Sequence, residues 1–457
     1  MIKFFPLILI ASLAFAQSPS LLKITKSQGL NKLEATQINK DTISAELKRE
    51  LDNEFRLWYP LCLDTEYGGY YSDINYKWEL DGEQTKMIVT QSRHIWSNAY
   101  AALFYKTDKP YKHYAEHGLK FLRDVMWDKK YGGFYNLVDR KGNVIKENGK
   151  IIKQAYGISF AIYGLAAYYK AFHDTAALNL AKETFYWLEK HSYDPEYGGY
   201  FQFLSQDGIP FKDGYGETPP KDQNTSIHLL ECFSELYSVW PDSKLKERLN
   251  SILHIIRDTV IGSKKYMTLF FKRDWTPVSF QDASQEIREK NYEFDHISFG
   301  HDVETAYLML EASKELGIEN DSATIRVAKE LDDFTLQNGW DIKNGGIYDR
   351  GYIFKGDKEV TIIRNAKEWW CQIEALNSFL LMSKLFPDAK ENYYEKFCLE
   401  WEHIKRYLID PVYGGWFWDS IDTSPDAKLS HKGSIWKATY HTARGLMNSI
   451  NQLKNEK

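Results

Sequence analysis

A doubled glycine recurs five times along the chain, usually with aromatic neighbours. The pairs are Gly68-Gly69, Gly132-Gly133, Gly198-Gly199, Gly345-Gly346 and Gly414-Gly415, and their first glycines are separated by 64, 66, 147 and 69 residues. The long interval is twice a short one, which predicts a sixth, degenerate copy near residue 270, within Met267–Phe271 and the following Asp274-Trp275. A fixed period of this length is typical of a repeat architecture, in which each copy adds one structural unit.

Between the glycine pairs, apolar residues recur with the period of an α-helix. Each glycine pair lies between an odd-numbered helix and the next even one, and glycine permits the positive φ values of a tight hairpin turn. The unit is therefore helix, small β-hairpin, helix, and six units predict an all-α fold that closes as a ring. The expected helices cover residues 44–61, 86–106, 110–127, 152–173, 176–191, 222–240, 243–260, 297–316, 321–337, 365–385, 390–408 and 433–453.

The composition of the helices predicts which of them line the ring. The even helices are rich in Ala, Gly and aromatic residues, as over 160–168, and suit six inner positions that pack on both sides. The odd helices carry more Lys and Glu and suit six outer positions. The segment 262–296 is longer than its counterparts and rich in charge, so we expect an extended loop over one end of the ring.

The N-terminus is typical of an exported protein. A basic start, an apolar run and the ending Ala14-Phe15-Ala16 predict a secretory signal peptide over residues 1–16. Residues 17–44 form a polar leader, and residues 45–457 are expected to be a single catalytic domain. We therefore expect a periplasmic or extracellular location.

Composition also bears on partners. A net charge of −5 without a basic stripe disfavours nucleic acid, and the apolar N-terminal run is too short to span a membrane. The expected partner is a small molecule, bound by a monomer. Of the four cysteines, Cys232 and Cys371 lie within helical patterns and are expected to be buried thiols.

The first turns of the even helices are unusually polar for inner helices. In a closed ring these turns meet at one end, so we expect one pocket that holds histidines, carboxylates, an arginine and tryptophans. The residues are Gln91, Arg93, Trp96, Gln154, Tyr156, Asn224, His228, Glu231, His301, Glu304, Trp369, Trp370, Glu374, Trp436, His441 and Arg444. His228, His301 and His441 together are also a candidate three-histidine metal site. The sequence has no compact ligand motif for such a site, so it favours a pocket without a metal.

Such a pocket suits acid–base chemistry on a sugar. Histidine accepts and returns protons near neutral pH. Two histidines on opposite walls can remove the proton at C2 of an opened aldose and reprotonate that carbon from the other face through an enediolate. Arg93 is placed to stabilise the enediolate oxygen, since fixed positive charge at developing negative charge is a large catalytic effect. This chemistry requires no redox cofactor.

Five segments together resemble the cellobiose 2-epimerases of the N-acylglucosamine 2-epimerase superfamily, which are (α/α)6 barrels. The resemblance covers about residues 45–453, and its motifs are 91–96, 224–228, 300–304, 368–374 and 436–441. It implies an isomerase that epimerises C2 of the reducing-end sugar of a β-1,4-linked disaccharide, without a metal. Cellobiose would give glucosyl-mannose, and mannobiose would give mannosyl-glucose.

The resemblance also implies roles for individual residues. His301 and His441 would be the acid–base pair, His228 would assist ring opening, and Arg93 would bind near O1 and O2. Glu304 would orient its neighbours. The substrate-binding residues would be Trp370, Trp436, Asn224, Glu374, Tyr156 and Tyr307. Tyr307 stands where the family often has Trp, and the spacing from His228 to His301 is longer than expected.

The residues alone leave several other functions open. Within the superfamily these are N-acylglucosamine 2-epimerase and an aldose–ketose isomerase of the mannose type. A glycoside hydrolase or a polysaccharide lyase on the same barrel is a third, although a hydrolase needs two opposed carboxylates. A non-catalytic sugar-binding barrel is the fourth, and it would not need two facing histidines.

Overall fold

A computed structural model of the protein describes residues 40–454. The expected signal peptide and most of the polar leader lie outside the described residues. Residues 40–44, which were assigned to the leader, already belong to the first helix.

Twelve long helices alternate between outer and inner positions. The outer helices are α1 (Lys40–Trp58), α3 (Tyr111–Phe121), α5 (Thr175–His191), α7 (Ser243–Ile255), α10 (Ser322–Asn338) and α12 (Tyr393–Tyr407). The inner helices are α2 (Ile88–Tyr105), α4 (Ala155–Phe172), α6 (Gln223–Val239), α9 (Phe299–Glu315), α11 (Trp369–Leu385) and α13 (Tyr440–Lys454). Short π-helical turns, η2 (Leu122–Met126) and η3 (Ile256–Ile261), extend α3 and α7, and a 3-10 turn, η4 (Pro425–Leu429), precedes α13.

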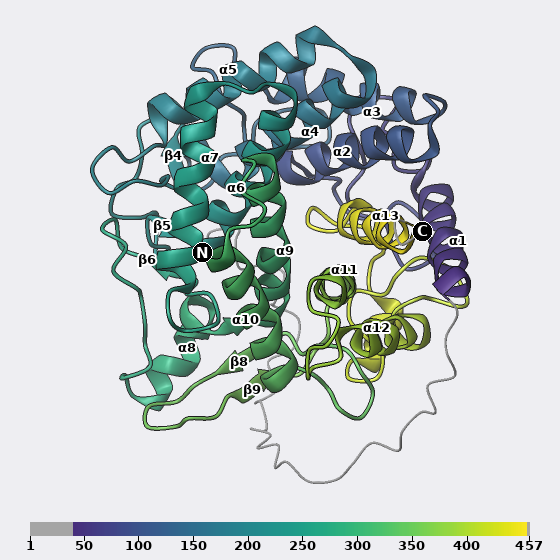
Figure 1. Ribbon diagram of the computed structural model, residues 1–457. Coiled ribbons are helices and arrows are strands. Elements are labelled where there is room, and N and C mark those ends of the chain that lie inside the picture. The colour runs from purple at the N-terminus through teal and green to yellow at the C-terminus, as the bar shows by residue number, and fades with distance from the viewer. Residues whose placement is uncertain (1–39, 455–457) are drawn as a thin grey trace.

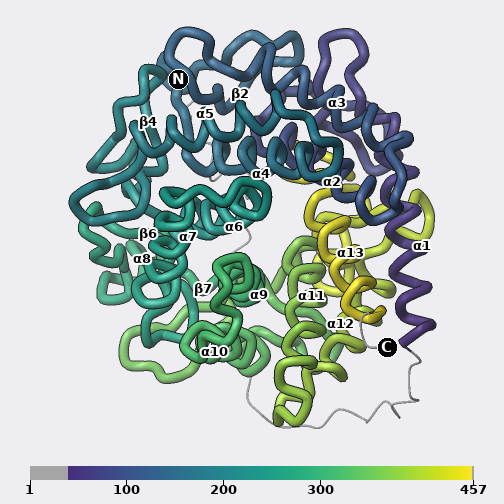
Figure 2. Tube along the Cα trace, turned by 45° about the horizontal axis from the view of Figure 1, so that its top comes forward, coloured from purple at the N-terminus to yellow at the C-terminus, as the bar shows by residue number. Residues whose placement is uncertain are grey.

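The inner helices form a closed ring inside the outer ones (Figures 1 and 2). Each inner helix packs on the next, and α13 closes the ring against α2. The first outer helix, α1, packs on the last inner helix, α13. Small residues permit this density, since a Cβ at Gly164 of α4 would lie 2.9 Å from the carbonyl oxygen of Ser92 in α2. The expected (α/α)6 barrel is confirmed.

Short antiparallel strands join one repeat to the next at the end where the inner helices begin. β1 (Lys86–Met87) pairs with β2 (Leu137–Val138), β3 (Ile152–Gln154) with β4 (Phe203–Ser205), and β5 (Lys221–Asp222) with β6 (Phe270–Phe271). β7 (Ile297–Ser298), β8 (Arg350–Tyr352) and β9 (Thr361–Arg364) form a three-stranded sheet. A strand therefore leads directly into each of α2, α4, α6 and α9, which fixes where their first turns start.

Each glycine turn is tied to the following inner helix by a buried ion pair that the sequence pattern did not reveal. In the first repeat, Lys86 Nζ donates to Asp64 Oδ2 at 2.9 Å and to the carbonyl of Gly68 at 2.6 Å. The same arrangement recurs in Lys153–Asp128, Lys221–Asp194, Lys367–Asp341 and Lys432–Asp410. An unpaired buried charge is costly, so each lysine fixes the turn against the strand or loop that precedes an inner helix.

The second glycine of a turn is required because an aromatic ring covers it. At Gly199, where φ is +70°, a Cβ would lie 2.4 Å from the ring of Trp275. Trp275 also donates its indole N–H to the carbonyl of Tyr197 at 3.0 Å. Phe121, Trp187, His403 and Trp78 cover the other four turns. The doubled glycine thus combines a left-handed backbone with close ring packing.

The sixth copy lies a few residues before the predicted place. Met267–Phe271 corresponds to the strand that follows a glycine turn, since Phe270–Phe271 forms β6. The degenerate turn centres on Lys265, which has a φ of 66° although it is not glycine. The expected extended loop over 262–296 is also partly wrong, because Gln285–Asp295 forms an additional helix, α8.

The expectation for two cysteines is confirmed within the described residues. Cys232 and Cys371 are buried free thiols, and Cys62 and Cys398 are free as well. No helix among residues 40–454 has the length and apolarity needed to cross a membrane.

Candidate active site

The starts of the inner helices bring most of the predicted site residues to one end of the barrel. Arg93 lies on α2, Tyr156 on α4, Asn224 and His228 on α6, His301, Glu304 and Tyr307 on α9, Trp370 and Glu374 on α11, and His441 on α13. The start of α6 is fixed by Asp222, whose carboxylate accepts the backbone N–H of Thr225 at 2.5 Å. Asn224 and His228 then lie one turn apart on the same face.

Arg444 of α13 is the centre of the site. Its guanidinium is buried and binds three carboxylates: Glu231 through Nη1, and Glu304 at 2.5 Å and Glu374 at 2.7 Å through Nη2. Burial raises the pKa of Glu231, but the charge of Arg444 and the bond to His228 outweigh it and lower that pKa to about 2. Burial leaves the pKa of Glu374 raised in spite of Arg444. One cation thus joins three inner helices through their acidic side chains.

His441 is oriented by Glu374. Its Nδ1 lies 2.6 Å from Glu374 Oε1, and the other oxygen of this carboxyl group accepts the hydroxyl of Tyr307 at 2.5 Å. With an ionised Glu374, Nδ1 carries the proton and Nε2 keeps a free lone pair. Burial, together with the positive charge of Arg93, holds the pKa of His441 well below its usual value. His441 is therefore a neutral imidazole at physiological pH.

His301 faces the same tryptophan as His441. Its Nδ1 lies 2.9 Å from Ser298 Oγ, and its ring centroid lies 4.7 Å from that of Trp370. The centroid of His441 lies 5.7 Å from Trp370. Burial lowers the pKa of His301 to about 4, so this imidazole is also neutral near pH 7. The two imidazoles approach Trp370 from α9 and α13, the two neighbours of α11 in the ring.

His228 forms a second histidine–glutamate pair. Its Nδ1 lies 2.9 Å from Glu231 Oε2. Its ring packs against Phe160 and Tyr156, with centroid distances of 4.6 and 5.3 Å. Because Arg444 holds Glu231 ionised, Nδ1 of His228 donates and Nε2 is the atom left for a ligand.

Arg93 is held between aromatic rings. It donates to the carbonyl of Trp436 at 3.2 Å and to the hydroxyl of Tyr156 at 3.4 Å. Its guanidinium carbon lies 4.4 Å from the ring centroid of Phe160 and 4.9 Å from that of Tyr440. Its Nε and the Oδ1 of Asn224 are buried without a hydrogen-bond partner, and polar groups of this kind are suited to bind a polar ligand.

The structure corrects the predicted place of some residues. Trp436 lies in the turn before α13, because that helix begins at Tyr440 and not at 433. Gln91 does not face the pocket: its amide donates to the carbonyl of Tyr70 and accepts the N–H of the same residue. Trp96 lies deeper in the barrel and stacks on Tyr100 at 4.3 Å. Gln154 is the last residue of β3 and pairs with Phe203 of β4, and Trp369 packs on Trp418 with a centroid distance of 4.6 Å.

Three residues that support the pocket were missed. Tyr440 binds Glu231 and Arg444, Ser298 contacts His301, and Glu368 accepts the indole N–H of Trp370 at 2.7 Å. Tyr440 and Ser298 lie one and three residues from a predicted histidine, which was an available signal. Glu368 belongs to a quoted motif, but its role depends on the fold of the loop before α11.

The three histidines do not form the metal site that their number suggested. Within residues 40–454, the potential metal ligands that converge are Glu304, Glu374 and His441, whose donor atoms lie within 4.8 Å of one another. The guanidinium of Arg444 already binds both carboxylates. The positive charge that balances these glutamates therefore belongs to a side chain.

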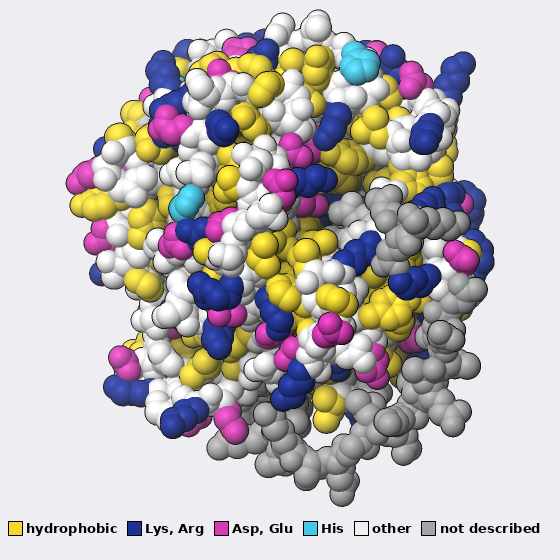
Figure 3. Space-filling view, in the orientation of Figure 1, with side chains coloured by type: hydrophobic (Ala, Val, Ile, Leu, Met, Phe, Trp, Pro, Cys, Tyr) yellow, Lys and Arg dark blue, Asp and Glu magenta, His cyan; other side chains and the backbone are white. Residues whose placement is uncertain are grey.

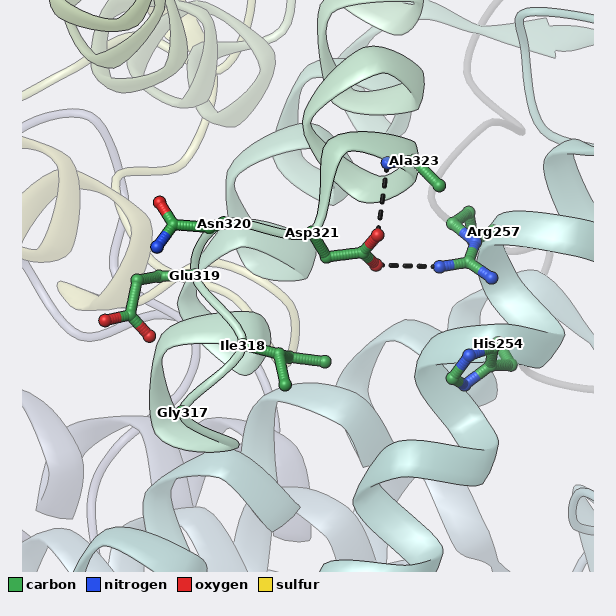
Figure 4. A pocket seen from close by; sticks show the side chains of 8 residues that line it. All are labelled: His254, Arg257, Gly317, Ile318, Glu319, Asn320, Asp321 and Ala323. Atoms are coloured by element: carbon green, nitrogen blue, oxygen red, sulfur yellow. Dashed lines mark hydrogen bonds and ion pairs between the residues drawn. The ribbon is translucent and has the colours of Figure 1, made fainter.

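A separate surface hollow lies between the end of α7 and the loop before α10 (Figure 4). It has a volume of about 590 Å³. Its charged groups satisfy one another, since Asp321 accepts the N–H of Ala323 at 3.1 Å and pairs with Arg257 at 2.8 Å. The histidine pocket instead brings together His301, His441 and Glu231, whose pKa values are all lowered, and it is the better candidate for chemistry.

The barrel and the histidine pocket define a class of protein, the carbohydrate epimerases and isomerases. The chain belongs to the N-acylglucosamine 2-epimerase (GlcNAc 2-epimerase) family, whose model matches residues 69–444. It is therefore an enzyme of the isomerase type, as the resemblance implied.

Individual relatives agree with this assignment. The chain is 28% identical over 408 residues to the cellobiose 2-epimerase of Bacteroides fragilis. The aligned region covers 87% of this chain and 97% of the relative. It is 24% identical over 406 residues to the D-mannose isomerase of Marinomonas mediterranea, covering 87% and 95%. The solved cellobiose 2-epimerase of Spirochaeta thermophila superposes with a TM-score of 0.79 and 28% identity, covering 93% of this chain and 99% of that one.

Proposed function

We propose that the protein epimerises C2 of the reducing-end sugar of a β-1,4-linked disaccharide. Cellobiose would give glucosyl-mannose, and mannobiose would give mannosyl-glucose. The observation that carries the proposal is the pair of neutral imidazoles, His301 and His441, which come from the two helices that flank α11 and lie with their centroids 4.7 and 5.7 Å from that of Trp370. Two bases on opposite walls are what inversion at one carbon requires.

The reaction follows from these positions. One imidazole takes the proton from C2 of the open-chain sugar, and the electron pair moves through C1 to O1 to form an enediolate. The other imidazole, which rests neutral and first takes up a proton from solvent, delivers that proton to the opposite face of C2 and returns to its neutral form. Arg93 stabilises the charge on O1, because a fixed guanidinium costs no reorganisation when that charge develops. His228 assists ring opening by moving a proton between the ring oxygen and the hydroxyl at C1.

The half-buried tryptophans support a substrate larger than a monosaccharide. Trp370 is fixed by Glu368, and Trp436 is fixed through its carbonyl by Arg93, so both indoles present faces on which a sugar ring can pack. Asn224 and Glu374 are suited to bind hydroxyl groups. The cellobiose 2-epimerases among the relatives favour the disaccharide over a single sugar.

Aldose–ketose isomerisation is the second candidate. It passes through the same enediolate and differs only in whether the proton returns to C2 or to C1. The D-mannose isomerase among the relatives favours this alternative. N-acylglucosamine 2-epimerase activity, after which the family is named, is a third possibility that uses the same proton transfers.

Glycoside hydrolysis is disfavoured by the state of the carboxylates. A hydrolase requires one carboxylic acid and one carboxylate on opposite sides of the scissile bond. Glu231, Glu304 and Glu374 all bind the single guanidinium of Arg444, so none of the three is free to act as an opposed catalytic carboxyl group.

Proton NMR in deuterated water distinguishes these functions. The protein is incubated with cellobiose and, separately, with mannobiose. Loss of the reducing-end H2 signal together with the epimer supports the proposal. A ketose without the epimer supports the isomerase, and free monosaccharide supports a hydrolase. The absence of exchange on either disaccharide and on mannose and N-acetylglucosamine would overturn the acid–base mechanism.

A further inference from the structure

A second chamber lies inside the barrel, at the end opposite the histidine pocket. It is lined by the C-terminal halves of the inner helices and has a volume of about 180 Å³. That volume holds about six water molecules at roughly 30 Å³ each. The rings of Trp96 and Tyr163, stacked at 5.3 Å, form part of its wall, and the Nε1 of Trp96 is buried without a partner.

The chamber reaches the back of the histidine pocket. Glu231 and Arg444 line it, although both also belong to the charged cluster of the pocket. The Oε2 atom of Glu231 lies 2.9 Å from His228 Nδ1. Glu231 is thus the group between a histidine of the pocket and the water space behind it.

The outer end of the chamber is open to solvent and bordered by charged side chains. Glu311 and Lys314 of α9 line it and are exposed. Lys170 of α4 donates to Glu235 of α6 at 3.3 Å. Acidic and basic side chains gather on this face, where α6, α9 and α13 come together (Figure 3).

We propose that this chamber is a proton-exchange path, through which His228 equilibrates with bulk solvent by way of Glu231 at the end of the barrel opposite the substrate entrance. A proton that arrives at His228 Nε2 is balanced by the departure of the Nδ1 proton to Glu231 Oε2. Glu231 then passes it to chamber water and returns to its ionised form. The low pKa of Glu231 means that this carboxylate does not retain the proton.

The catalytic role of this path rests on the proposed function. A disaccharide that fills the entrance separates His228 from solvent on that side. Ring opening and closing nevertheless require His228 to start every turnover in the same protonation state. Exchange through the back of the barrel meets this need while the substrate stays bound.

The test measures deuterium exchange at Cε1 of each histidine ring in the full chain by mass spectrometry. The exchange is followed from pH 5 to 9, so that the effect of ring protonation is separated from the effect of solvent access. Ser234→Leu fills the chamber one turn beyond Glu231, and Asn448→Leu fills it from α13. Ser383→Leu is the matched control, because it makes the same change on α11, which does not line the chamber. Thermal unfolding checks that each variant is folded.

We expect both chamber variants to slow the exchange of His228 by at least about fivefold, with His301 within about twofold of its original rate. The control should leave all three pocket histidines unchanged. An unaltered His228 rate in both chamber variants would overturn the proposal, and so would equal slowing of all three histidines. The measurement requires no substrate, so it stands whether or not the protein epimerises a disaccharide.

Discussion

Arg444 and His441 contact the same oxygen atom of Glu374. The guanidinium Nη2 lies 2.7 Å from Oε1, and the imidazole Nδ1 lies 2.6 Å from it. The orientation of His441 therefore depends on a charge balance that extends through Arg444 to Glu231 and Glu304 on two other helices.

Replacing Arg444 by Met should destabilise the fold strongly. The variant leaves three carboxylates buried without their cation, and loss of one partner of a buried ion pair costs about 3–5 kcal/mol. Urea unfolding followed by tryptophan fluorescence measures the loss. Arg326→Met is the control, because Arg326 pairs with Glu330 on the surface of α10 and such pairs contribute about 1 kcal/mol or less. Equal losses in the two variants would show that the cluster does not depend on its arginine.

Glu374→Gln should reduce catalysis and spare the fold. The amide is neutral and no longer fixes the Nδ1–H tautomer of His441, so we expect kcat to fall by at least about 100-fold. The value of KM should change far less than kcat, because Trp370 and Trp436 still bind the sugar rings. Initial rates of epimer formation measure both constants. Glu50→Gln is the matched control, since it changes another buried glutamate, bound to the indole of Trp416 at 2.9 Å, outside the pocket. An E374Q enzyme as active as the control would remove Glu374 from the orientation of His441.

The activity should persist at unusually low pH for a histidine enzyme. Burial lowers the pKa of His301 to about 4, and a base functions only when unprotonated. Its accepting form is therefore present above pH 4 and lost below it, so the rate at which the substrate loses its C2 proton to deuterated water, a step that needs only the base, should hold from pH 7 to about pH 5 and fall about tenfold per unit below pH 4. Circular dichroism at each pH separates this decline from unfolding. An acid limb near pH 6.5 would mean that the imidazole titrates as it does in water.

Gly199→Ala should destabilise the barrel more than Gly149→Ala. Both glycines have positive φ, at +70° and +79°, so both alanines are strained. At Gly199 the new Cβ would also lie 2.4 Å from the ring of Trp275, whereas at Gly149 it meets nothing within 4 Å. The difference should be about 1–3 kcal/mol, as for other overpacked sites. Parallel denaturant titrations measure it, and equal stabilities would show that the ring is free to move aside.

We also propose that the protein is exported and processed. The Ala14-Phe15-Ala16 ending predicts cleavage after Ala16, which leaves Gln17 as the first residue of the mature chain. The intact mass and N-terminal peptide of protein expressed from the full sequence in a bacterial host check this. Full-length chain recovered from the cytosolic fraction would contradict it.

The repeat period and helical pattern were enough to predict the architecture, because both are local properties of the chain. The buried pairs such as Lys86–Asp64 were not predictable, because their members lie 22 residues apart in a polar stretch that looks solvent-exposed. The sixth turn was misplaced for a related reason: Lys265 adopts the backbone conformation of glycine, and residue identity gives no sign of it. The extra helix α8 lies within a segment whose high charge resembles a loop.

The histidines were predictable because each lies near the start of an inner helix and their convergence follows from ring closure. Arg444 was also expected in the pocket, but its position at the centre of the charged cluster was not predictable. Its importance depends on carboxylates from α6, α9 and α11 meeting at one point, which is a property of side-chain packing. Sequence periodicity identifies the face of a helix but not which of its turns meets a given neighbour.

The contact between α1 and α13 has a consequence for the order of events in the cell. The first helix to be synthesised rests on the last one, and the ring has no closing partner for α2 until α13 exists. His441 and Arg444 are part of that final segment. The nascent chain thus has to emerge almost completely before its reaction centre can assemble, which makes this a fold of long-range contacts that matures only after translation.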